Sequence, residues 1–93
     1  MATILRTNDT LLEVQPKNGT DFQLEELQTI VGGYIEILHS RGDDTIMVIN
    51  EEGKIQGLPE NINATIEALL KGMIGWDDHI VGDVLVCKSE EVK

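Results

Sequence analysis

The side chains best suited to chemistry lie close together near the C-terminal end of the sequence. Asp77, Asp78 and His79 are consecutive, and Asp83 follows four positions later. Carboxylates and imidazole serve in metal centres and in general acid–base catalysis. Consecutive side chains point in different directions, however, and a metal centre needs three or four ligands on one ion. We therefore expect a solvated loop here, and an enzyme only if Asp78, His79 and Asp83 converge in one pocket.

The remaining nucleophile and base candidates also favour a non-catalytic protein. Cys87 lies within an apolar strand pattern, which predicts a buried and unreactive thiol. His39 stands at the end of another strand pattern, far from His79 in the sequence. We find no calcium-loop spacing and no glycine-rich phosphate loop. The sequence thus predicts no catalytic residues, no metal ligands and no cofactor.

Length and charge restrict the class of protein. The chain has 93 residues, which predicts one domain over residues 1–93, with a frayed tail over residues 88–93. Seven basic and seventeen acidic side chains give a net charge of −10, shared equally by the two halves. Such a charge repels nucleic acids and anionic membranes and favours a basic partner. The lone cysteine, the absence of a signal-peptide pattern and the lack of an apolar run of about 18 residues predict a cytoplasmic location.

Hydrophobic periodicity predicts six strands and two helices, which would position the acidic, histidine and cysteine side chains named above. The residues from 45 to 50 form the strongest strand pattern, because their run of apolar side chains is typical of a strand covered on both faces. The expected strands cover residues 3–6, 11–15, 34–38, 45–50, 54–56 and 84–88, and the expected helices cover residues 21–31 and 61–71. This order predicts an α+β fold, with a small, mainly antiparallel sheet of about five strands and two helices on one face.

Both helices have an apolar side and recognisable ends. In the first, Leu24, Leu27 and Val31 share a face, and the Gly32-Gly33 pair ends the helix because glycine adopts the left-handed conformation of a C-cap. In the second, the shared apolar face is formed by Ile62, Ile66, Leu69 and Leu70. Asn61 or Asn63 is expected to cap this second helix.

Four short blocks in order resemble a known protein family. Residues 24–36 read LEELQ-x-x-VGGYIE, residues 50–54 read NEEGK, residues 57–61 read GLP-x-N and residues 80–83 read IVGD. Together they resemble a family of small uncharacterised proteins from bacteriophages, plasmids and gut bacteria, over residues 22–86. The resemblance implies an accessory protein of a phage or mobile element in a bacterial cytoplasm. It implies no activity and no catalytic or binding residue.

Turn and cap chemistry explains most of these blocks, but it leaves polar residues that the expected fold does not require. They are Gln28, Tyr34, Glu36 and Asn61. The alternation along residues 34–38 predicts that Ile35 and Ile37 face the helices while Tyr34 and Glu36 point outward.

The outward residues predict a partner-binding surface. An exposed tyrosine offers a large contact area with little loss of side-chain entropy. We therefore expect a partner or a second subunit to cover Tyr34 and Glu36, flanked by Glu51 and Glu52.

Three hypotheses for the function follow. The first is a non-enzymatic acidic binding protein of a phage or mobile element that engages and inhibits a bacterial host defence or DNA-handling protein with a basic surface. The alternative is a small-molecule binder that sequesters a nucleotide signal, with Tyr34 or Trp76 stacking on a base. The third is an enzyme. None requires direct nucleic-acid or membrane contact, and each is compatible with a homo-oligomer.

Overall fold

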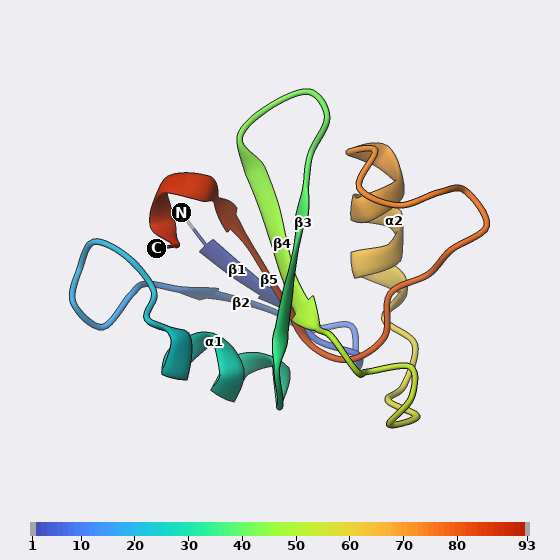
Figure 1. The fold of residues 1–93 in the computed structure, drawn as a ribbon, viewed down its shortest axis with the longest axis horizontal. Coiled ribbons are helices and arrows are strands. Elements are labelled where there is room, and N and C mark those ends of the chain that lie inside the picture. The colour runs from blue at the N-terminus through green and yellow to red at the C-terminus, as the bar shows by residue number, and fades with distance from the viewer. Residues whose placement is uncertain (1, 93) are drawn as a thin grey trace.

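The computed structural model describes residues 2–92, in which five antiparallel strands form one sheet with two α-helices packed against it (Figure 1). The strand order across the sheet is β2-β1-β5-β4-β3. This arrangement confirms the α+β class. Neither helix is long and apolar enough to span a membrane. The elements are β1 (Ala2–Leu5), β2 (Leu11–Val14), α1 (Leu24–Val31), β3 (Ile35–His39), β4 (Thr45–Asn50), α2 (Ile62–Leu70), β5 (Val84–Lys88) and the short 3₁₀ helix η1 (Ser89–Glu91).

Strands β4 and β5 are apolar on both faces and form the centre of the core. In β4, Ile46 and Val48 belong to one buried cluster, whereas Met47 belongs to the other. The register pairs Val48 with Leu85 of β5, whose side chain lies in the same cluster as that of Val48. Both faces of β4 are therefore covered, as its sequence predicts.

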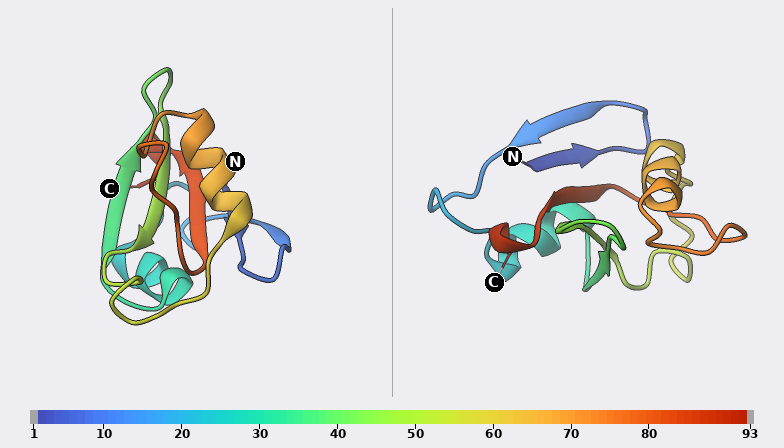
Figure 2. Two further views of the ribbon diagram at one scale, coloured as in Figure 1. Left: turned by 90° about the vertical axis from the view of Figure 1, so that its right-hand side faces the viewer. Right: turned by 90° about the horizontal axis from the view of Figure 1, so that it is seen from above.

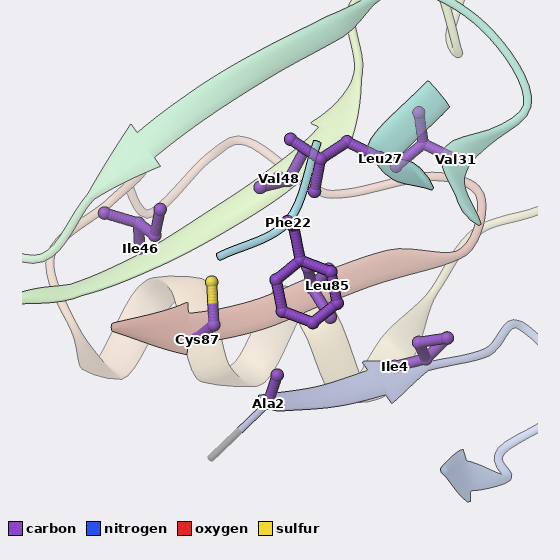
Figure 3. Packing of buried hydrophobic residues seen from close by; sticks show 9 residues of the cluster. All are labelled: Ala2, Ile4, Phe22, Leu27, Val31, Ile46, Val48, Leu85 and Cys87. Atoms are coloured by element: carbon purple, nitrogen blue, oxygen red, sulfur yellow. The ribbon is translucent and has the colours of Figure 1, made fainter. Parts of the chain in front are cut away.

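The two helices cover opposite faces of the sheet, so the expectation of two helices on one face is wrong. Leu27 and Val31 of α1 pack on one face, and Ala64 and Ala68 of α2 pack on the other. Figure 2 shows the two helices apart from each other in both views. We call the buried side chains on the α1 side of the sheet the α1 cluster, and Figure 3 shows Phe22 among them. The members of this cluster are Ala2, Ile4, Phe22, Leu27, Val31, Ile46, Val48, Leu85 and Cys87. The physical reason is the two-sided apolar pattern of β4 and β5, because each face must be shielded from water.

Helix α2 also presents a different side to the sheet than its periodicity suggests. Ala64 and Ala68 are buried, whereas the four large aliphatic side chains of the expected apolar face are exposed. The two alanine side chains are buried in the cluster that contains Met47 and Val84, and the aliphatic side chains point to solvent. These are Ile62, Ile66, Leu69 and Leu70.

Two further segments differ from expectation. Residues 54–56, expected to form a strand, lie in a run of turns in which the Leu58 amide donates to the Gly53 carbonyl. The segment after β5, expected to be frayed, forms η1, and Val92 pairs with Phe22 in a parallel bridge. Lys93, the last residue of the expected tail, lies outside the described residues.

Candidate partner-binding site

The acidic and histidine side chains near the C-terminal end do not form one centre. Asp78 accepts hydrogen bonds from Lys54 Nζ and from the backbone amide of His79, and the Lys54 ammonium lowers the pKa of Asp78. Asp83 instead accepts a hydrogen bond from the Thr7 amide at 3.0 Å and borders a different hollow. Over residues 2–92, no three His, Cys, Asp or Glu side chains come together in a way that would hold a metal ion.

Cys87 is buried in the α1 cluster, as its position in the strand predicts. Burial raises the pKa of its thiol to about 12. Since the thiolate is the reactive form, this thiol stays protonated and unreactive at neutral pH.

The orientation predicted for residues 34–37 is confirmed. Tyr34 is 67% exposed, and Glu36 is exposed as well. Ile35 and Ile37 are partly buried and pack against the α1 cluster. Tyr34 lies just before β3, where its carbonyl accepts a hydrogen bond from the Glu51 amide at 2.8 Å.

The four residues predicted to form one surface line two separate hollows. Tyr34 and Glu52 line an open hollow of about 460 Å³, whereas Glu36 and Glu51 line a narrower one of about 160 Å³ that also contains Asp78 and His79. We call the first the tyrosine hollow and the second the histidine hollow. The tyrosine hollow is lined by Glu25, Gln28, Thr29, Gly33, Tyr34, Glu52 and Gln56.

Helix α1 and its C-cap form one wall of the tyrosine hollow. The helix begins after Gln23, where Glu26 accepts a hydrogen bond from the Gln23 amide in a capping box. It ends at Gly32, whose left-handed backbone (φ 81°) reverses the chain toward Tyr34. Glu25, Gln28 and Thr29 then face the hollow because residues three and four positions apart share a helix face.

A buried amide, Asn50, connects that wall to the opposite one. Its Nδ2 donates to the Val31 carbonyl at 3.2 Å and to Gln56 Oε1 at 3.3 Å, and its Oδ1 accepts from the Glu52 amide at 2.8 Å. A Cβ atom at Gly33 would approach Asn50 Nδ2 to 3.0 Å, so glycine permits this close contact. Asn50 therefore positions Glu52 and Gln56 relative to the end of α1.

Sequence reasoning missed this role of Asn50, because it assigned the residue to turn chemistry alone. The available signal was a polar side chain at the end of an apolar strand, a position where burial requires hydrogen-bond partners. Asn61, which was interpreted as a residue the fold does not require, is also buried and fully hydrogen-bonded. That interpretation is wrong, whereas the prediction that Asn61 or Asn63 caps α2 is confirmed, and Asn61 is the residue that does so.

The tyrosine hollow has an unbalanced negative charge. Glu25 and Glu52 line it without any basic side chain, and neither forms an ion pair within residues 2–92. The ion pairs that the structure describes lie elsewhere: Lys54 with Asp78, Lys71 with Asp43 and Lys88 with Asp44. Two uncompensated carboxylates beside an exposed tyrosine ring are suited to a cationic group.

A third hollow, of about 430 Å³, lies beside α1 on the β1–β2 side of the sheet. Its apolar lining consists of Ile4, Val14, Phe22 and Ile30. Its charged lining is mixed, with Lys17, Glu25 and Glu26 at its edge, so it shows no preference for one sign of charge.

Fold and site together define a small acidic α+β protein with an open, carboxylate-lined hollow on its surface. The chain belongs to the family described as domain of unknown function (DUF3846), whose family model matches residues 2–93. This confirms the expected relationship to a family of uncharacterised proteins. Comparison with curated proteins found no match, and comparison with solved structures found none.

Proposed function

We propose that this chain is a non-enzymatic binding protein that uses the tyrosine hollow to engage a partner protein through an arginine or lysine side chain. The observation that carries the proposal is the presence of Glu25, Glu52 and the exposed Tyr34 ring in one hollow that has no basic residue of its own. A guanidinium group can pair with carboxylates and stack on an aromatic ring at the same time.

The magnitudes indicate how such a site contributes. An exposed ion pair is worth about 0.2–1 kcal/mol, and an exposed cation–π contact about 0.5–1 kcal/mol. Two such ion pairs and one such contact give at most about 3 kcal/mol, so a single arginine binds with a Kd of several millimolar or weaker. The physiological partner must add a wider contact surface, and the net charge of −10 accelerates its approach if its surface is basic.

The specific version of this proposal is a protein of a phage or mobile element that acts in the bacterial cytoplasm. Its partner would be a host defence or DNA-handling protein, which it inhibits by occupying a basic nucleic-acid groove. An acidic surface that carries an aromatic side chain has the charge to compete for such a groove. The four sequence blocks that resemble proteins of phages and plasmids support this context.

The alternative, a binder of nucleotide signals, has less support from the hollows. The tyrosine hollow would place a phosphate beside Glu25 and Glu52. The histidine hollow contains Lys54, but that lysine is already paired with Asp78. A thermal-shift screen with a panel of nucleotides tests the alternative, because a ligand well above its Kd raises the melting temperature.

An NMR titration tests the proposed function directly. The ¹⁵N-labelled chain is titrated with a blocked Gly-Arg-Gly peptide and with the matching citrulline peptide, which has the same shape without the charge. We expect the arginine peptide, but not the citrulline peptide, to change the chemical shifts of the backbone amides of Gly33, Tyr34 and Glu52. The Glu52→Gln variant should bind the arginine peptide more weakly.

The matched control is Glu13→Gln. This change removes the same charge from an exposed position on β2, outside the tyrosine hollow. It should leave the arginine titration unchanged. Equal shifts with arginine and citrulline, or equal losses in both variants, would show that the hollow does not recognise a cation.

A further inference from the structure

Helix α2 carries an exposed aliphatic stripe that the fold of a single chain leaves uncovered. Ile62, Ile66 and Leu70 follow one another at intervals of four and are 59%, 51% and 79% exposed, and Leu69 lies beside them. All four side chains are aliphatic, so this surface of the helix is uncharged. Large apolar side chains gathered on one helix face are typical of an interaction surface.

The stripe cannot turn inward by rotation of the helix. Asn61, at the start of α2, donates hydrogen bonds to the carbonyls of Leu5 and Gly82 and accepts one from the Ala64 amide. Ala64 and Ala68 pack against the sheet with no exposed surface. Rotation would break these hydrogen bonds and force larger side chains into the space of the alanines, so the outward direction of the stripe is a fixed property of the fold.

From this geometry we infer that α2 is the interface between two copies of this chain, packed antiparallel about a two-fold axis at Ile66. The spacing of the stripe is symmetric about that residue. A two-fold axis there places Ile66 against its own counterpart and Ile62 against Leu70 of the second copy. Such self-complementarity is what a symmetric dimer requires.

Charge favours a second copy over a basic partner at this surface. A basic protein is attracted to carboxylates, and the stripe has none. Two copies of a chain with a net charge of −10 repel each other, so they associate best through an uncharged surface. The charged residues on the helix and at its C-cap are Glu67 and Lys71, which have opposite signs, and Lys71 is paired with Asp43.

The available area predicts a reversible dimer. A helix of nine residues is about 13 Å long, so its face supplies only part of the roughly 800 Å² per subunit of a standard interface. The loop over residues 72–79 runs beside α2 (Figures 1 and 2) and includes the exposed Trp76, which can add to the contact. We therefore expect dissociation in the micromolar range.

Sedimentation velocity over a concentration series of the full chain tests the dimer. We expect the wild type to shift from monomer to dimer between about 1 and 500 μM, a range set by micromolar dissociation. Ile66→Asp should remain monomeric throughout, because it places two carboxylates together at the axis. Its melting temperature, measured where the wild type is monomeric, shows whether the fold is retained.

The matched control is Leu24→Asp. Leu24 is 54% exposed, close to the value for Ile66, and it lies on α1, on the opposite face of the sheet. An acidic residue suits the first turn of a helix. This variant should dimerise like the wild type. A wild type that stays monomeric at 500 μM, or an Ile66→Asp variant that still dimerises, would overturn the inference.

Disulfide trapping tests the position of the axis even if Ile66→Asp fails to fold. Ile66→Cys should form a covalent dimer under mild oxidation much faster than Leu24→Cys, because only the former brings two thiols together. The native Cys87 does not interfere, since it is buried. Equal rates for the two variants would exclude an interface centred on Ile66. Because Tyr34 and Glu52 are not part of this interface, Glu52→Gln should leave dimerisation unchanged whether or not the tyrosine hollow binds a partner.

Discussion

The side-chain amide of Asn61 donates a hydrogen bond to the backbone carbonyl of Leu5, 56 positions earlier in the chain, at 2.9 Å. A second donation, to the Gly82 carbonyl at 2.8 Å, connects the same side chain to the approach to β5. Its oxygen caps α2 by accepting from the Ala64 amide. One fully buried side chain thus joins β1, the segment before β5 and the start of α2, and it fixes which side of α2 is exposed.

Replacing Asn61 should destabilise the fold strongly. Asn61→Ala removes the cap and the two hydrogen bonds that the side chain donates to the carbonyls of Leu5 and Gly82, so we expect a loss of about 2–4 kcal/mol in the free energy of unfolding. Asn61→Asp should be at least as harmful, since it directs a carboxylate oxygen at those carbonyls. Urea unfolding measures both. Asn63→Ala, a change in the first turn of the same helix, is the control and should cost no more than about 0.5 kcal/mol. A small loss for both asparagines would contradict the role of Asn61.

The contact between Gly33 and Asn50 should be sensitive to a single methyl group. Gly33→Ala places its Cβ 3.0 Å from Asn50 Nδ2, so Asn50 must move and its hydrogen bonds must weaken. We expect a loss of about 1 kcal/mol in stability, the typical net value of one hydrogen bond, together with weaker binding of the arginine peptide. The control is Gly42→Ala, which meets no atom within 4 Å and should be neutral or slightly stabilising. Equal effects at the two glycines would show that the contact is unimportant.

Tyr34 should matter for binding and not for stability. Because the side chain is 67% exposed, Tyr34→Ala should change the free energy of unfolding by no more than about 0.5 kcal/mol. The same variant should lose affinity for the arginine peptide and for a basic partner protein retained from a bacterial lysate at low salt. A destabilisation of several kcal/mol would identify Tyr34 as a core residue instead.

The ion pair between Asp43 and Lys71 predicts how stability depends on pH. Its N–O distance is 2.9 Å, and the Lys71 ammonium holds the pKa of Asp43 well below its usual range. A carboxyl group with a lowered pKa in the folded state adds stability above its unfolded pKa of about 3.9, and this contribution is lost as the pH falls through the folded value. Asp43→Asn should therefore be less stable than the wild type near pH 7, with the difference shrinking below about pH 4.

Thermal unfolding from pH 2 to pH 8 measures this dependence. The pair is exposed, so the expected difference is small and should decrease with added salt. Adding Lys71→Gln to the Asp43→Asn variant should cause little further loss, since the partner has already been removed. A difference that stays constant from pH 2 to pH 8 would show that another effect of the asparagine is responsible.

Local sequence determined most of the elements and their ends. The bounds of β4 and β5 agree with their apolar runs, and Gly32 ends α1 in the left-handed conformation that its residue type predicts. The Asn61 cap and the outward direction of Tyr34 were also predictable. These features depend on interactions within a few residues, such as capping and strand alternation, and the sequence records such interactions directly.

Only the tertiary structure decided which surfaces meet. Periodicity showed that α2 has an aliphatic side, but Ala64 and Ala68 on the other side pack against the sheet, where the hydrogen bonds of Asn61 hold the start of the helix. The tyrosine hollow likewise depends on Asn50, whose partners Val31 and Gln56 come from different segments of the chain. The choice between two helix faces, and the contacts of a buried amide, depend on what the rest of the chain brings near them, and a local sequence pattern does not contain that information.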